Sequence, residues 1–106
     1  ITEMGMGTDV HGQDYTVAAE RAVFDAIHHS SLHFFKHLRK SANDMVIDLM
    51  VAVPKPKEVD EERLIRSLPY GTVNLFLSEG GLEIPGDDGD DAIVIANAGV
   101  IVRLDD

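Results

Sequence analysis

The segment covering residues 92–104 constrains the fold of this chain more than any other part of the sequence. Its first eleven residues, 92–102, contain Asn97 as their only polar side chain and are rich in Ile and Val. β-Branched residues in such a run indicate a β-strand. A strand that is apolar on both sides is usually buried on both faces. The sheet that contains this strand therefore needs a cover on each face.

The rest of the sequence predicts the element order β-α-β-α-β-β. We expect strands at 1–6, 45–53, 73–77 and 92–104, joined before the last strand by a loop with an acidic run at 86–91. Thr16 is a candidate helix cap. The apolar residues of the helix that follows recur at helical spacing at Ala19, Ala22, Val23, Ala26 and Ile27. A short helix or irregular turn is expected at 32–38, and a further helix begins at Glu58 or Asp60 and ends before 69–71.

These elements indicate one domain covering residues 1–106, of the α+β class. The expected architecture is a two-layer α/β sandwich, with a four-stranded mixed sheet and the helices on one face. Two or three short helices cover only that face. We therefore expect the chain to form a homo-oligomer through the other face. The alternative is that the first strand and the acidic loop fold over it.

Composition and charge exclude several classes of protein. The 9 Lys and Arg residues against 19 Asp and Glu residues give a net charge of −10, which argues against nucleic acid or an anionic membrane as a partner. No apolar run approaches the ~20 residues of a membrane span. The chain has no cysteine, which excludes disulfides and thiolate metal sites and fits a cytoplasmic location.

Residues 5–14 form the most unusual stretch, because three glycines, two aspartates and a histidine occur within ten residues. In an extended segment, Asp9 and His11 would point the same way. The pair could contribute to a divalent metal site, or Asp9 could orient His11 as a catalytic general base. Gly5, Gly7 and Gly12 would let a bound ligand approach the backbone. The structural alternative is that Asp9 caps a turn and the glycines permit positive φ.

This stretch also carries a resemblance. It matches the GxGxDxHG signature of a small uncharacterised family of bacterial and plant proteins, and the likeness extends over nearly the whole chain. The signature positions are Gly5, Gly7, Asp9, His11 and Gly12. The resemblance implies a site within residues 5–12 and implies no activity, substrate or cofactor. Residues 5–11 are also similar to the opening of the cyclodiphosphate synthase of the methylerythritol pathway, where such a stretch supplies metal ligands; that likeness is an analogy only.

Three other groups of polar residues are candidate sites. A histidine stripe at 29, 33 and 37, preceded by Asp25, could bind metal on a continuous helix, although a surface turn explains it better. Asp48 lies within an apolar strand and is either a catalytic or supporting carboxylate or a water-facing residue at a strand edge. The acidic run could attract calcium, but it lacks the spacing of an EF-hand and reads as a mobile loop.

Two hypotheses about function follow. The first is a small enzyme that acts on a small polar metabolite, with Asp9 and His11 at a subunit interface and a divalent metal as a possible cofactor. The second is a non-catalytic oligomeric protein that binds a small ligand at the same loop. The sequence contains no nucleophile or phosphate-binding motif that would favour the enzyme.

Overall fold

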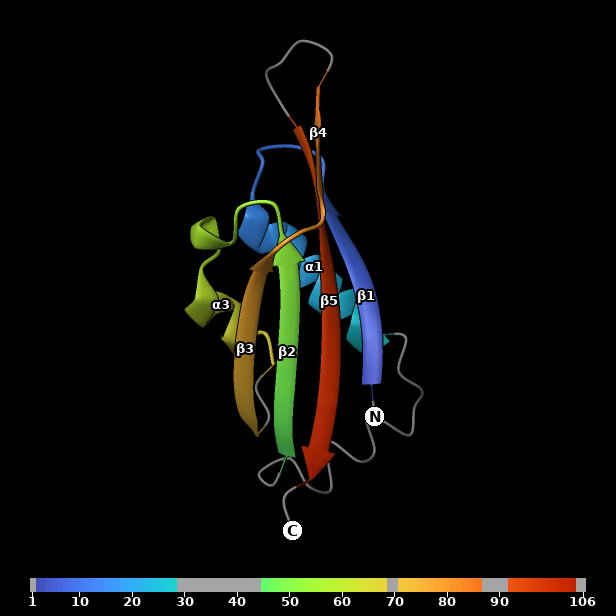
Figure 1. The fold of residues 1–106 in the computed structure, drawn as a ribbon, viewed down its shortest axis with the longest axis vertical. Helices are drawn as coiled ribbons and strands as arrows, with labels where there is room; N and C mark the ends of the chain where they lie inside the picture. Colours follow the sequence, from blue (N-terminus) through green and yellow to red (C-terminus); the bar gives the residue numbers. More distant parts are fainter. Residues whose placement is uncertain (1, 29–44, 69–70, 87–91, 105–106) are drawn as a thin grey trace.

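The structure is a computed structural model and describes residues 2–28, 45–68, 71–86 and 92–104 (Figure 1). A five-stranded sheet forms one layer, and two helices pack on one of its faces. The chain runs through β1 (Thr2–Asp9), α1 (Tyr15–His28), β2 (Met45–Val53), a short 3-10 turn (Pro56–Glu58), α3 (Glu61–Arg66), β3 (Thr72–Glu79), β4 (Leu82–Pro85) and β5 (Ala92–Leu104). The predicted α+β class and mixed sheet are confirmed.

The strand order β1-β5-β2-β3 places the long apolar strand β5 between β1 and β2. β5 is antiparallel to both neighbours, whereas β2 and β3 are parallel. The prediction of four strands was wrong, because β4 is a fifth strand within the segment expected to be a loop. It pairs with the first residues of β5, Leu82 opposite Ile95 and Ile84 opposite Ile93.

Local hydrogen bonds explain where both helices begin. The carboxylate of Asp14 accepts a bond of 3.1 Å from the Val17 N–H, so Asp14 caps α1. The expectation that Thr16 is the cap was wrong. Thr16 is buried in the first turn, where its hydroxyl accepts a bond of 2.9 Å from the Asp60 N–H. Asp60 in turn caps α3 by accepting from the Arg63 N–H, at one of the two predicted starts.

Helix α1 packs directly on β1 because the facing residues are small. Ala22 and Ala26 are fully buried on the helix side. On the strand side, a Cβ at Gly5 would lie 2.5 Å from the Ala22 carbonyl oxygen, and one at Gly7 would lie 2.6 Å from the Arg21 carbonyl carbon. Both distances are far inside van der Waals contact. Gly5 and Gly7 therefore allow the two backbones to touch.

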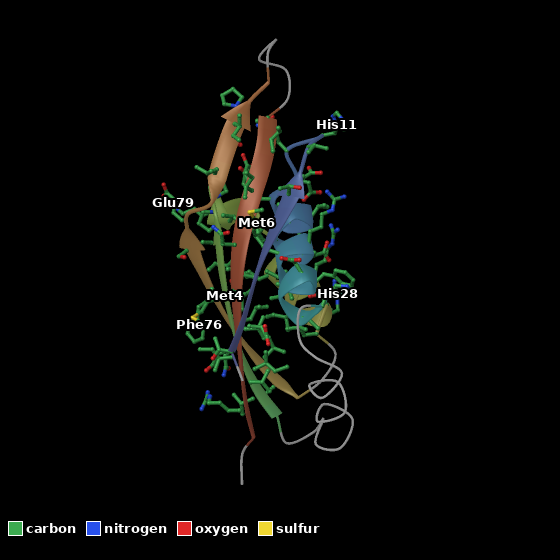
Figure 2. All side chains as sticks on the ribbon, turned by 90° about the vertical axis from the view of Figure 1, so that its right-hand side faces the viewer. Met4, Met6, His11, His28, Phe76 and Glu79 are labelled. Atoms are coloured by element: carbon green, nitrogen blue, oxygen red, sulfur yellow. The ribbon has the colours of Figure 1, made fainter. Side chains whose placement is uncertain are left out.

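The sheet is buried on one face only. Along β5, residues 92, 94, 96, 98 and 100 are buried beneath the helices, whereas 93 and 97 between them are exposed. Among the described residues, no element covers the other face of β5, so the burial on both faces that its composition predicted is not found there. Figure 2 shows Met4, Met6 and Phe76 on the side of the sheet away from α1. The histidines at 29, 33 and 37, the predicted element at 32–38 and most of the acidic run lie outside the described residues.

Candidate functional site

The loop between β1 and α1 is fastened at both ends by a buried carboxylate. Asp9, the last residue of β1, is 6 % exposed, and its Oδ2 accepts a bond of 2.8 Å from the Asp14 N–H. Its Oδ1 lies 3.4 Å from Nη1 of Arg21, which also donates a bond of 2.6 Å to the Thr8 carbonyl. The carboxylate thus holds the start of α1 against the end of β1. This contact fixes the shape of residues 10–13.

His11 lies at the outer side of this loop. β1 ends at Asp9 and the chain bends at His11, so the alternation of an extended strand does not continue to it. Asp9 is buried whereas His11 is exposed, so the strand geometry on which the expected pairing of the two side chains rested does not extend to His11. Figure 2 places His11 beyond the end of β1, near the end of α1 that is opposite to His28. Their assignment as a catalytic pair stays a prediction.

The middle of the loop has an unusual backbone. Gly12 and Gln13 have positive φ values of 89° and 49°, and Gln13 is the one non-glycine residue with positive φ in the described part of the chain. Such a conformation costs a bulky residue on the order of 1 kcal/mol. The Gln13 amide donates a bond of 3.3 Å to Oε1 of Glu83. The side chain is therefore tied to β4 while the backbone is held in a conformation that glycine would adopt more easily.

Glu83 joins this loop to the start of α1. The Tyr15 hydroxyl donates a short hydrogen bond to the same oxygen, Oε1, that Gln13 contacts. Burial, and then the contact with Glu83, raise the pKa of Tyr15 to about 12. The bond from Tyr15 lowers the pKa of Glu83, and Lys55, whose Nζ lies 5.9 Å from the centre of the Tyr15 ring, adds to this effect. Glu83 is therefore a negative charge at neutral pH.

Sequence reasoning missed Glu83 and Tyr15 as parts of this site. Glu83 is 70 residues from Gln13, and the segment around it was read as a loop. The signal was nevertheless present, because residues 82–84 alternate apolar, polar and apolar after a double glycine. Such alternation after a turn is typical of a short strand.

The metal-ligating potential of the site rests on few side chains. In the ranges that the structure describes, no three or more His, Asp or Glu side chains are grouped so as to hold a metal ion. Asp9 and His11 stay the two predicted ligands, and both Asp9 oxygens already contact Asp14 or Arg21. Gly12 could let a ligand come close, since a Cβ there would meet no atom within 4 Å. Gly5 and Gly7, also predicted to bind a ligand, lie against α1 instead.

Asp48 belongs to a separate polar group on the opposite face of the sheet. Its two oxygens accept bonds of 3.2 Å from Nδ2 of Asn74 and 3.0 Å from Nη2 of Arg103. The register places Asn74 of β3 directly opposite Asp48, whereas Arg103 of β5 lies opposite Val46 and reaches Asp48 diagonally. Asp48 is thus held by partners on both neighbouring strands. It has no contact with the loop.

The fold is that of a small α+β protein with a five-stranded mixed sheet that helices cover on one face, and Asp9 and Glu83 hold the loop of residues 10–13. The chain belongs to a family described as "conserved hypothetical protein (Lin0512_fam)", whose model matches residues 1–102. It is also similar to the crystal structure of an FtsZ-like protein of unknown function from Nostoc punctiforme. The identity is 39 %, the match covers 100 % of this chain and 94 % of that chain, and the TM-score is 0.84.

A comparison with curated proteins found no match. Among the helices of the described residues, none combines the length and the apolar character that crossing a membrane requires.

Proposed function

We propose that this chain is a subunit of a homo-oligomer that binds a small polar molecule at residues 10–13, with His11 in contact with the ligand. The observation that carries this proposal is the backbone of Gln13, which has positive φ and is tied through its side chain to Glu83. Strained backbone persists only where the surroundings enforce it, and it is concentrated at functional sites. The contacts made by Asp9, Tyr15 and Glu83 supply that enforcement.

The loop and its surroundings contain residues that position it and residues that are exposed at its surface. Asp9 positions the loop through the Asp14 N–H. His11 is exposed and is the side chain best placed to meet a ligand, either as a hydrogen-bonding group or as an acid or base. Gly12 leaves the backbone accessible. The charged carboxylate of Glu83 favours a ligand that carries hydrogen-bond donors or a positive charge.

Between the two hypotheses from the sequence, the contacts of Asp9 favour binding over catalysis. A carboxylate that activates His11 must reach it, whereas this one is buried and is engaged by Asp14 and Arg21. Under the enzyme hypothesis, His11 would act on the ligand as an acid or base without help from Asp9. A divalent metal held by Asp9 and His11 also stays within the proposal, and elemental analysis decides it directly.

The test compares two histidine variants of the purified protein. Elemental analysis for divalent metals comes first, followed by a thermal-shift screen against polar metabolites and metal ions. We expect His11→Gln to abolish the stabilisation given by a hit, and His28→Gln to keep it, because His28 stacks on Phe24 at the far end of α1. A hit that stabilises the His11→Gln variant as strongly as the wild type would overturn the proposal.

A further variant, Gln13→Gly, tests the role of the strained backbone. Gln13→Gly permits the positive φ without strain but removes the amide that contacts Glu83. We expect its stability to stay close to that of the wild type while its affinity for the hit falls several-fold. Unchanged affinity would show that the shape of the loop is not what the ligand needs.

A further inference from the structure

One face of the sheet is covered by no element of the described residues, and we call it the open face. It consists of the side chains that alternate with the buried ones along each strand, as the pairing register shows. Its members are 2, 4, 6 and 8 of β1, 46, 48, 50 and 52 of β2, 72, 74, 76 and 78 of β3, 82 and 84 of β4, and the odd-numbered residues 93–103 of β5.

The exposed apolar side chains of this protein are concentrated on the open face. Seven of the nine large hydrophobic residues that are exposed in the described ranges lie there: Met4, Met6, Met50, Phe76, Leu82, Ile84 and Ile93. Exposed apolar groups scattered singly are normal, but a contiguous patch marks an interaction site. The two others, Val10 and Phe24, lie in the loop and on α1.

The patch has an apolar centre that crosses the whole sheet. The register aligns Met4, Gly99, Met50 and Phe76 in one row across β1, β5, β2 and β3. Gly99 leaves a low point in this row, because the nearest atom to a Cβ there would be the Met50 Cε, 3.6 Å away. Flexible methionines beside a gap can fill an irregular opposing surface.

The charges on the open face indicate what covers it. The chain carries a net charge of −10, yet the open face as defined contains one acidic and one basic residue, Asp48 and Arg103, joined to each other at 3.0 Å; Glu79, the last residue of β3, lies at its margin (Figure 2). A cationic partner would find no excess of negative charge there, and an anionic surface would find no cluster of basic residues. A second copy of the same face meets a neutral surface, so association adds no net like charges at the contact itself.

We infer that the open face is the contact between two copies of this chain, packed sheet against sheet around the row Met4–Gly99–Met50–Phe76. The composition agrees with such a contact, because interface cores are enriched in Met and aromatic residues and depleted of Lys and Glu. Polar Thr, Ser and Asn side chains at 2, 8, 72, 74 and 78 lie around this row as a rim. Two identical faces in contact form an isologous dimer related by a two-fold axis. The inference rests on the homo-oligomer of the proposed function and is independent of the ligand loop.

The test compares two phenylalanines of similar exposure on opposite layers. Phe76 is 56 % exposed on the open face, and Phe24 is 69 % exposed on α1. Light scattering during size-exclusion chromatography should give about twice the monomer mass of 11.6 kDa for the wild type. Phe76→Glu should give the monomer mass, because each interface would bury two carboxylates, whereas Phe24→Glu should keep the wild-type mass. Circular dichroism and thermal unfolding establish that both variants are folded.

The remaining results overturn the inference. A wild type that stays monomeric at high protein concentration would assign the open face to a different protein or to a lipid surface. A dimer that survives Phe76→Glu, and also Met50→Glu at the centre of the row, would place the contact on another surface. These outcomes are separate from the ligand test, since His11→Gln should leave the oligomer unchanged.

Discussion

The hydroxyl of Tyr15, the first residue of α1, donates a hydrogen bond to the Glu83 carboxylate of β4, 68 residues further along the chain. The contact joins the start of the helix to a strand of only four residues. It also raises the pKa of Tyr15 and lowers that of Glu83, because a protonated phenol beside a charged carboxylate is the favoured pair. The loop that carries His11 lies between β1 and this contact.

Removing the Tyr15 hydroxyl should release Glu83. In Tyr15→Phe we expect the pKa of the Glu83 carboxyl to rise towards its ordinary value, because its main hydrogen-bond donor is lost. The stability contributed by a lowered pKa is present above the unfolded value and is lost as the pH falls through the folded value. The variant should therefore be less stable than the wild type at neutral pH, and the difference should shrink in acid. Carboxyl NMR titration with urea unfolding measures both; identical Glu83 titration curves would contradict the prediction.

The stability that Tyr15 contributes depends on pH in the opposite direction, and it is lost in alkali. Its pKa is raised from 10.0 to about 12, so the folded protein holds this proton where the unfolded chain has lost it. The stability involved is fully present below the unfolded pKa and declines as the pH rises from 10.0 to about 12. Ultraviolet absorbance of tyrosinate in a Tyr70→Phe background follows Tyr15 alone. Ionisation near the ordinary value in the folded protein would contradict both the burial of the Tyr15 hydroxyl and its contact with Glu83.

An added methyl group at Gly7 should destabilise the fold. A Cβ there overlaps the backbone of α1, which has no flexible side chain that could move aside. We expect Gly7→Ala to lower the free energy of unfolding by ~1–3 kcal/mol or more, or about 4–8 °C in Tm for each kcal/mol. Gly99→Ala is the matched control when both variants are compared in the Phe76→Glu background, where the open-face contact does not contribute, since its Cβ would lie 3.6 Å from Met50. Equal losses in the two variants would refute the close packing of α1 on β1.

Asp9 should matter for stability even without any ligand. Asp9→Ala removes the buried carboxylate that accepts from the Asp14 N–H and faces the Arg21 guanidinium, and the loss of hydrogen bonds to a charged group costs about 1.5–3 kcal/mol. Asp9→Asn keeps one acceptor oxygen and should lose less. Urea unfolding of the two variants at neutral pH measures the difference. A fully stable Asp9→Ala protein would return Asp9 to a purely functional role.

The Asp48 carboxylate should be dispensable for the ligand loop. It lies on the open face, and its ion pair with Arg103 is partly exposed, with side-chain exposures of 21 % and 55 %. Such pairs contribute roughly 0.2–1 kcal/mol, so Asp48→Asn should unfold close to the wild type. Its affinity for a ligand of the loop should be unchanged in isothermal titration calorimetry. A large loss of affinity would connect the two faces of the sheet.

The sequence carried enough information for most of the fold. The bounds of β2 and β5 agree with the predicted 45–53 and 92–104. Long runs of β-branched residues are typical of strands; a proline ends the first run, and a loop precedes the second. The buried face of α1 agrees with helical spacing at Ala19, Ala22, Val23 and Ala26. β4 was not predicted because the single alternation at 82–84 is a weak signal for a strand of only four residues. Its existence depends on pairing with β5, which is a tertiary contact.

The site was predictable in position but not in arrangement. Residues 5–14 were identified from their composition, but three of their special residues have packing roles that only the structure shows: Gly5, Gly7 and Asp9. His11 lies two residues beyond the end of β1, so the alternation of a strand, which would put it beside Asp9, does not extend to it. Glu83 was out of reach because no local pattern connects it to Gln13 or Tyr15.

The contact between α1 and β1 leaves no side chain between the two backbones. Most helix–sheet packings can be retuned by exchanging one apolar side chain for another of a different size, which shifts the helix by a fraction of a turn. Here there is no such spacer to exchange at Gly5 and Gly7. The distance between helix and strand is therefore a fixed dimension of this molecule. If the loop binds a ligand as proposed, variation in the ligand it accepts has to come from the loop residues themselves and from the strand that carries Glu83.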